Sequence, residues 1–152
     1  MVTLALAWRR DSPRPLVLPF LAAQVVGAIL GVSLAHLMFD LPILQASTKV
    51  RTGLGQWSAE ATATFGLVLL IVLGVRKQAP GLPAAVAVYI VAAYWFTAST
   101  SFANPAVTIA RALSNTFAGI APADAPAFIA AQLIGALIAV TAARLLDGKG
   151  AG

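Results

Sequence analysis

The chain has 152 residues, of which 60% are hydrophobic and 10% are charged. A soluble globular domain has about 45–50% apolar and about 25% charged residues, so this composition excludes a soluble domain, a disordered chain and a nucleic-acid-binding protein. The absence of cysteine excludes disulfide scaffolds and thiolate metal sites. One histidine and five acidic residues also disfavour a multi-ligand metal site or a carboxylate-rich catalytic cleft. We therefore expect a membrane protein that is not an enzyme and has no cofactor.

Uncharged stretches predict the membrane spans. The first stretch, 16–39, contains no Asp, Glu, Lys or Arg, and the second, 57–75, contains only Glu60. A further uncharged stretch, 125–143, lies near the end of the chain. A bilayer core of about 30 Å needs about 20 helical residues, so each stretch is long enough to cross it.

The segment between the second and last of these stretches has a different pattern. We expect a helix over 83–96, because proline suits the first turn of a helix, and this helix is the remaining predicted span. A polar patch over 97–101 follows it, and a short helix over 105–113 begins after Asn104. At about 1.5 Å per residue, the short helix covers about half a bilayer. A half-length helix after a non-helical stretch indicates a re-entrant segment, which must be buried in protein or line water.

Basic residues are divided unequally between the two sides of this topology. Lys49 and Arg51 fall on one side, and Arg111 falls in the re-entrant segment. The other seven share the opposite side: Arg9, Arg10, Arg14, Arg76, Lys77, Arg144 and Lys149. Because cytoplasmic loops carry an excess of Lys and Arg, we expect a multi-pass protein of the cell membrane with both termini cytoplasmic.

The sequence contains an internal repeat. Residues 19–31 and 127–139 are identical at six of thirteen positions, and 1–5 resembles 106–110 in the same way. Three spans separate the starting points of the two copies, and since three is odd, the copies run in opposite directions across the bilayer. Such inverted repeats place a solute site near the midplane, at the ends of half-helices.

The repeat also predicts the domain organisation. We expect residues 1–152 to form a single partial channel domain, in which 1–39 is the end of the first repeat and 57–146 is the second repeat. By this symmetry the sequence lacks two spans and the start of one half-helix.

The motif Asn104-Pro105-Ala106, between a polar patch and a half-helix, resembles the second NPA motif of the aquaporin (major intrinsic protein) family. Glu60 with Thr64 resembles the glutamate-bearing helix that opens the second half of that family. The resemblance covers essentially the whole chain, aligned with the part of the family downstream of the first NPA motif. It implies an all-α membrane protein, an incomplete aquaporin-like inverted-repeat helical bundle with about four spans and one full re-entrant half-helix.

The resemblance also implies roles for individual residues. Asn104 would cap the half-helix and donate its side-chain amide into the pore, with Pro105 at the first helical position. The family's narrow selectivity filter maps onto Ala92, Ser101 and Val107. Most relatives carry arginine where this chain has Val107, so the substitution predicts a wider, less polar filter without a fixed cation.

An ionisable side chain inside a membrane has a high free-energy cost, so Glu60 should face the protein interior. The resemblance makes it a structural anchor that accepts hydrogen bonds from the backbone of the re-entrant segment. The alternative, a carboxylate in a proton relay, is disfavoured because no second acid shares the membrane.

The implied function is a passive transmembrane channel for small neutral solutes, in a family that forms homotetramers in the lipid bilayer. Candidate solutes are water, glycerol-like polyols and neutral metalloid hydroxides such as arsenite. One alternative is a truncated, non-conducting fragment of such a channel. The other is an ion-coupled transporter, which the single intramembrane acid disfavours.

Overall fold

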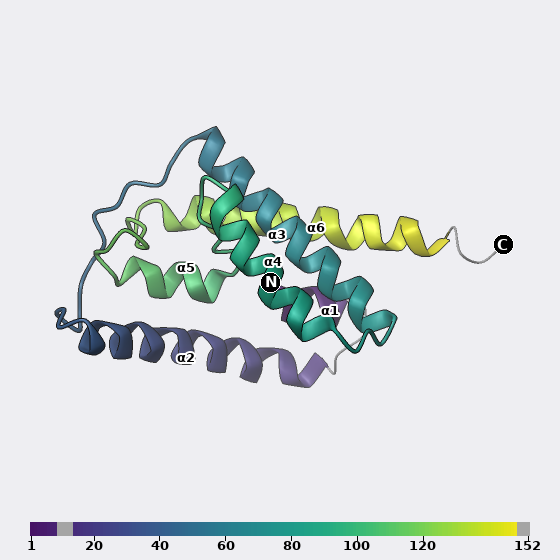
Figure 1. The fold of residues 1–152 in the computed structure, drawn as a ribbon, viewed down its shortest axis with the longest axis horizontal. Coiled ribbons are helices and arrows are strands. Elements are labelled where there is room, and N and C mark those ends of the chain that lie inside the picture. Colours follow the sequence, from purple (N-terminus) through teal and green to yellow (C-terminus); the bar gives the residue numbers. More distant parts are fainter. Residues whose placement is uncertain (9–13, 149–152) are drawn as a thin grey trace.

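The computed structural model describes residues 1–8 and 14–148, which are helical apart from their connecting segments. In chain order, the elements are α1 (Val2–Trp8), η1 (Arg14–Leu16), α2 (Val17–Met38), α3 (Leu54–Arg76), α4 (Leu82–Phe96), α5 (Pro105–Ala112) and α6 (Ala125–Gly148). Helices α3 and α6 pack extensively against each other, α4 packs on α3, and α2 packs against α5 (Figure 1). The described chain is thus an all-helical bundle, as the sequence predicts.

Three helices within the described residues are long and apolar enough to cross a membrane: α2, α3 and α6. The fourth predicted span is present as a helix, but α4 has 15 residues and is therefore about 22 Å long, shorter than a bilayer core of about 30 Å. Pro83 lies in its first turn, and its C-terminal cap, Thr97, has extended backbone. Helix α4 is therefore shorter than a full span, because Pro83 marks its beginning and the extended backbone at Thr97 ends it.

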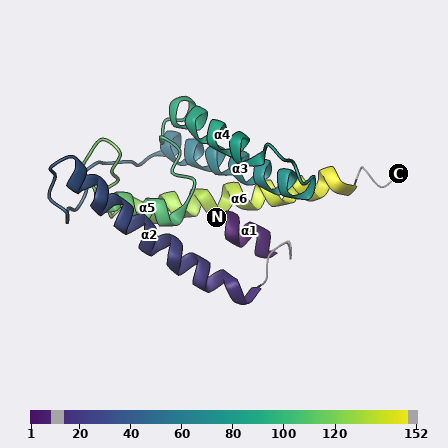
Figure 2. The ribbon, with the colours of Figure 1, turned by 60° about the horizontal axis from the view of Figure 1, so that its bottom comes forward.

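The two short helices lie between the long ones and run toward opposite ends of the bundle. Helix α1 starts near the middle of the molecule and leads toward the start of α2 (Figure 1). The far end of α5 instead meets the segment that follows α2, where the Ser47 amide donates to the Ala112 carbonyl at 2.9 Å. Figure 2 shows α5 at the N-terminal end of α6 and α1 beside the middle of α6. This antiparallel pair of half-helices is the arrangement that an inverted repeat predicts.

Small side chains allow these helices to approach closely. Met1, just before α1, and Ala5 of α1 lie in a core cluster with Val68 and Val72 of α3 and with Ala136, Ala139, Val140 and Ala143 of α6. A Cβ added at Gly135 would lie 2.2 Å from the carbonyl oxygen of Ala61. Close backbone approach through small residues is typical of helix packing in membranes, so α3 and α6 form the tight centre of the bundle.

Helix α2 has the opposite character. None of the residues in its most apolar window is buried, and its exposed large side chains include Leu18, Val26, Leu30, Leu34 and Leu37. A helix that is apolar on its exposed surface suits contact with lipid.

Candidate functional site

The candidate site begins at the N-terminus of α5, which lies inside the bundle. Asn104 has extended backbone and caps the helix, because its Oδ1 atom accepts a hydrogen bond of 3.0 Å from the Ala106 amide. Pro105 occupies the first turn, where its missing N–H costs nothing. Since the cap uses only the side-chain oxygen, the two donors on the Asn104 side-chain nitrogen are not consumed by it.

The residues before the cap, 97–103, form the re-entrant stretch. Thr100, Ser101 and Ala103 have φ values of 60°, 46° and 49°. These values lie in the left-handed region that residues other than glycine seldom adopt. Such a backbone persists only where surrounding contacts hold it, and the described structure contains such contacts on two sides.

Glu60 of α3 provides the first set of contacts. Its side chain is fully buried. Its Oε2 atom accepts a hydrogen bond of 3.1 Å from the Phe102 amide, and Oε1 accepts bonds from the Ala103 amide and from Gln132 Nε2, the latter at 2.8 Å. A buried carboxylate is tolerated when its oxygens are paired, and here two of the donors belong to the re-entrant backbone.

Gln132 of α6 connects this carboxylate to α5. Its Nε2 atom donates both to Glu60 and to Thr108 Oγ1, each at 2.8 Å. The sequence marks Gln132 only as a polar residue that recurs in the repeat. Its two partners lie 24 and 72 residues away, which is why no local pattern could identify them.

Arg51 provides the second set of contacts. Its side chain is buried, and its guanidinium donates to the backbone carbonyls of Gly119 at 2.7 Å, Phe117 at 2.8 Å and Ser99 at 3.3 Å. Burial lowers the pKa of Arg51 from its usual value. In the sequence, Arg51 is one of several basic residues in loops, whereas in the structure it joins the re-entrant stretch to the loop after α5.

The three predicted filter residues occupy different environments. Ser101 is buried in the re-entrant stretch, and its amide donates to Ser99 Oγ at 3.2 Å. Val107 is half-buried on α5 and packs against a cluster that contains Phe102 and Phe128. Ala92 lies on α4 with its side chain exposed.

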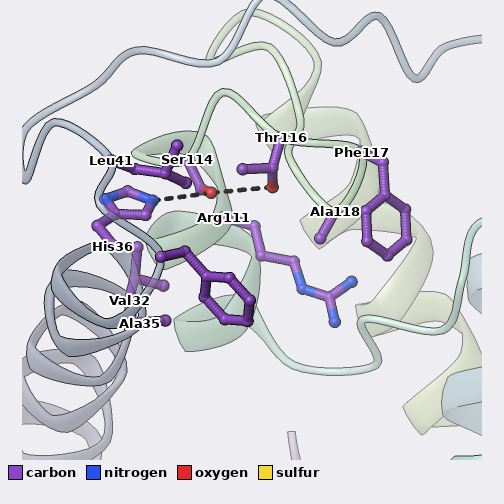
Figure 3. Close-up of a pocket in the computed structure, with 10 residues that line it drawn as sticks. Val32, Ala35, His36, Leu41, Arg111, Ser114, Thr116, Phe117 and Ala118 are labelled. Carbon is purple, nitrogen blue, oxygen red and sulfur yellow. Dashed lines mark hydrogen bonds between the residues drawn. The ribbon is translucent and has the colours of Figure 1, made fainter.

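A cavity of about 490 Å³ lies between α2, α5 and the loop after α5 (Figure 3). Its walls are mainly apolar, but they also carry His36, Arg111, Ser114 and Thr116. His36 Nε2 lies 3.0 Å from Ser114 Oγ, which in turn lies 3.1 Å from Thr116 Oγ1. No local sequence pattern predicts this cavity, because its walls come from segments about 80 residues apart in the chain.

Among residues 1–8 and 14–148, no cluster of three or more His, Cys, Asp or Glu side chains has the arrangement of a metal site. The polar groups near the N-terminus of α5 are hydrogen-bond donors and acceptors, among them Glu60, Asn104 and Thr108.

Comparison with known proteins gives one informative relationship. The chain is 57% identical over 127 residues to Aquaglyceroporin AqpS of Rhizobium meliloti (strain 1021), and the matched region covers 84% of this chain and 54% of that protein. The chain thus spans about half the length of this relative. No protein-family model matches the chain, and no solved structure matches it at a significant level.

Proposed function

Because the chain belongs to the aquaporin (major intrinsic protein) family, we propose that it contributes the second half of a passive channel for small neutral solutes. The solutes that fit this proposal are water, glycerol-like polyols and neutral metalloid hydroxides such as arsenite. The relative is an aquaglyceroporin by name, which favours glycerol as the first solute to test.

The observation that carries the proposal is the N-terminus of α5 inside the bundle, capped by Asn104. A helix N-terminus presents unpaired backbone N–H groups and about half a positive charge. Such an end binds the oxygen atoms of neutral solutes and repels cations. The Glu60 carboxylate holds the preceding backbone in place, so the donors are oriented before a solute arrives.

Three side chains set the width and polarity of the proposed filter: Ala92, Ser101 and Val107. All three are small or medium-sized, and position 107 is not charged. This combination favours passage of solutes larger than water.

We propose the same division of the chain as the repeat suggests, with 1–39 ending the first unit and 57–146 forming the second. Both termini would be cytoplasmic, and the assembled channel would be a homotetramer with one pathway per subunit. Cysteine-accessibility labelling of residues near each terminus would test the orientation.

The function is tested by reconstituting the chain in liposomes and measuring glycerol and water flux by stopped-flow light scattering. We expect glycerol to enter faster than in protein-free vesicles, and at a rate independent of any Na⁺ or H⁺ gradient. Dependence on an ion gradient would favour the transporter alternative. Rates equal to those of empty vesicles, for protein shown to be inserted and folded, would favour a non-conducting fragment.

A further inference from the structure

Two arginine side chains lie against the ring of Phe102 in the re-entrant stretch. The guanidinium carbon of Arg51 is 5.3 Å from the ring centroid, and that of Arg111 is 4.3 Å from it. Contacts of this kind attract the cation to the face of the ring. Phe102 therefore holds two positive charges beside the proposed filter residue Ser101.

The two cations differ in how their hydrogen-bond donors are used. Arg51 donates to three backbone carbonyl oxygens. Within the described residues, Arg111 makes one long hydrogen bond, from Nη1 to Thr100 Oγ1 at 3.4 Å. A guanidinium has five N–H donors, and an unpaired polar group that is removed from bulk water is costly. Arg51 is thus satisfied by the protein, whereas Arg111 keeps donors for a ligand.

The position of Arg111 directs those donors toward the proposed pathway. Arg111 follows Val107 by four residues on α5, so the two side chains share one face of the helix. Side chains on a helix lean toward its N-terminus, which brings the guanidinium back toward Val107. Val107 packs against the cluster that includes Phe102, and Arg111 lies over the same ring.

Arg111 also lines the 490 Å³ cavity, where Figure 3 shows its side chain between the α2 residues and Phe117. The cavity offers apolar walls from α2 and hydroxyl groups from Ser114 and Thr116. A small polyol has the matching chemistry, because its carbon chain suits the apolar wall and its oxygens accept hydrogen bonds.

We propose that Arg111 is a specificity-determining residue: its guanidinium donates hydrogen bonds to the oxygen atoms of neutral polyols in the cavity between α2 and α5, and it repels cations there. This inference rests on the proposed channel function. Val107 alone predicts a filter without a charge. In the proposed site, the Arg111 guanidinium supplies a positive charge from one helical turn further along α5.

The flux test compares Arg111→Gln, Arg111→Lys and the control Lys49→Gln in liposomes. Lys49 is an exposed cation in the loop after α2. Because a hydrogen bond to a charged group contributes enough for about a tenfold change in affinity, we expect Arg111→Gln to lower the glycerol-to-water permeability ratio about tenfold and to admit K⁺. Arg111→Lys should still exclude K⁺, and Lys49→Gln should resemble the unchanged protein. A folded Arg111→Gln variant with an unchanged ratio and no K⁺ leak overturns the inference.

A second test does not depend on flux. Phenylglyoxal modifies accessible guanidinium groups, and mass spectrometry identifies the modified residue. We expect modification of Arg111 that glycerol slows, while Arg51 stays unmodified because carbonyl groups occupy its donors. If the unchanged protein fails to conduct, the proposed function fails, and this experiment decides the inference separately: glycerol protection of Arg111 supports the site, and no modification or no protection overturns it.

Discussion

Gln132 of α6 donates a hydrogen bond of 2.8 Å to Thr108 of α5. Gln24 of α2 donates a bond of the same length to Thr3 of α1. The glutamines occupy equivalent positions of the internal repeat, and so do the threonines. In both cases the bond joins a short helix to the long helix that follows it in the chain. The same polar contact therefore fastens both half-helices, which supports the division of the chain into two related units.

This relationship predicts unequal effects for the two glutamines. Gln132→Leu removes the buried Nε2 donor that Glu60 Oε1 and Thr108 Oγ1 share, so the free energy of unfolding should fall by about 1–3 kcal/mol. Gln24→Leu should cost less, because its bond is only partly buried. Thermal unfolding in detergent, followed by circular dichroism, measures both. The exposed bond of Gln56 to the Ala98 carbonyl offers a control, Gln56→Leu, and a larger loss for Gln24→Leu than for Gln132→Leu would contradict the prediction.

Glu60→Gln replaces one acceptor oxygen with an NH₂ group that faces other donors. We expect a loss of stability of at least about 2 kcal/mol, since bonds to charged groups are the stronger ones. Amide hydrogen exchange at Phe102 or Ala103 should accelerate, because the two amides donate to different carboxylate oxygens and one of these oxygens is lost. Asp40→Asn is the matched control, since Asp40 is an exposed acid after α2. Unchanged exchange at both amides would show that Glu60 does not hold the re-entrant stretch.

Asn104 can be tested as a cap and as a pore donor separately. Asn104→Asp keeps a good helix cap but replaces the amide donors with a negative charge, so stability should change little while the liposomes begin to admit cations. Asn104→Ala loses the cap and should cost about 0.5–2 kcal/mol. The measurements are thermal unfolding and K⁺ flux. If liposomes that contain the Asn104→Asp variant remain impermeable to K⁺, the result argues against a pore role for Asn104.

Val107→Arg adds a long cationic side chain beside Phe102 and should narrow the proposed filter. We expect glycerol permeability to fall more than water permeability, because the larger solute is more sensitive to width. Val107→Leu, which adds bulk without charge, is the control. Equal loss of water and glycerol flux in the Val107→Arg variant would contradict the assignment of position 107 to the filter.

Gly135 and Gly27 occupy equivalent positions of the repeat but have different surroundings. A Cβ at Gly135 would collide with the Ala61 carbonyl oxygen at 2.2 Å, whereas a Cβ at Gly27 would meet nothing within 4 Å. Gly135→Ala should therefore force α3 and α6 apart and destabilise the fold by about 1–3 kcal/mol. Gly27→Ala should be neutral or stabilise by up to about 1 kcal/mol, because alanine is the better helix former. Thermal unfolding of the pair gives a direct comparison.

Much of this architecture can be predicted from local sequence. The long apolar stretches correspond to α2, α3 and α6, since twenty or so uncharged residues satisfy their backbone in lipid only as a helix. The start of α5 follows from Asn104-Pro105, because a capping side chain and a proline specify a helix N-terminus without help from distant residues. Helix α4, Leu82–Phe96, also agrees with the predicted helix over 83–96, because Pro83 marks its first turn and a polar patch follows its end.

The hydrogen-bond partners of the polar residues cannot be predicted from local sequence in this way. Arg51, Gln132 and His36 look ordinary in the sequence, and each finds its partners only when segments far apart in the chain come together. Arg111 differs in part, because its ring partner Phe102 is close in the chain, whereas the cavity that it lines is completed by residues of α2.

Helix positions and the motif at residues 104–106 are thus properties of the sequence itself, because they depend on hydropathy and capping within a few residues. The repeat is also a property of the sequence, because equivalent residues recur in register. Only the three-dimensional fold decided that Arg51 donates its hydrogen bonds to backbone carbonyl groups and that Arg111 lines a cavity. The reason is that a hydrogen bond depends on the distance between atoms and not on their separation along the chain.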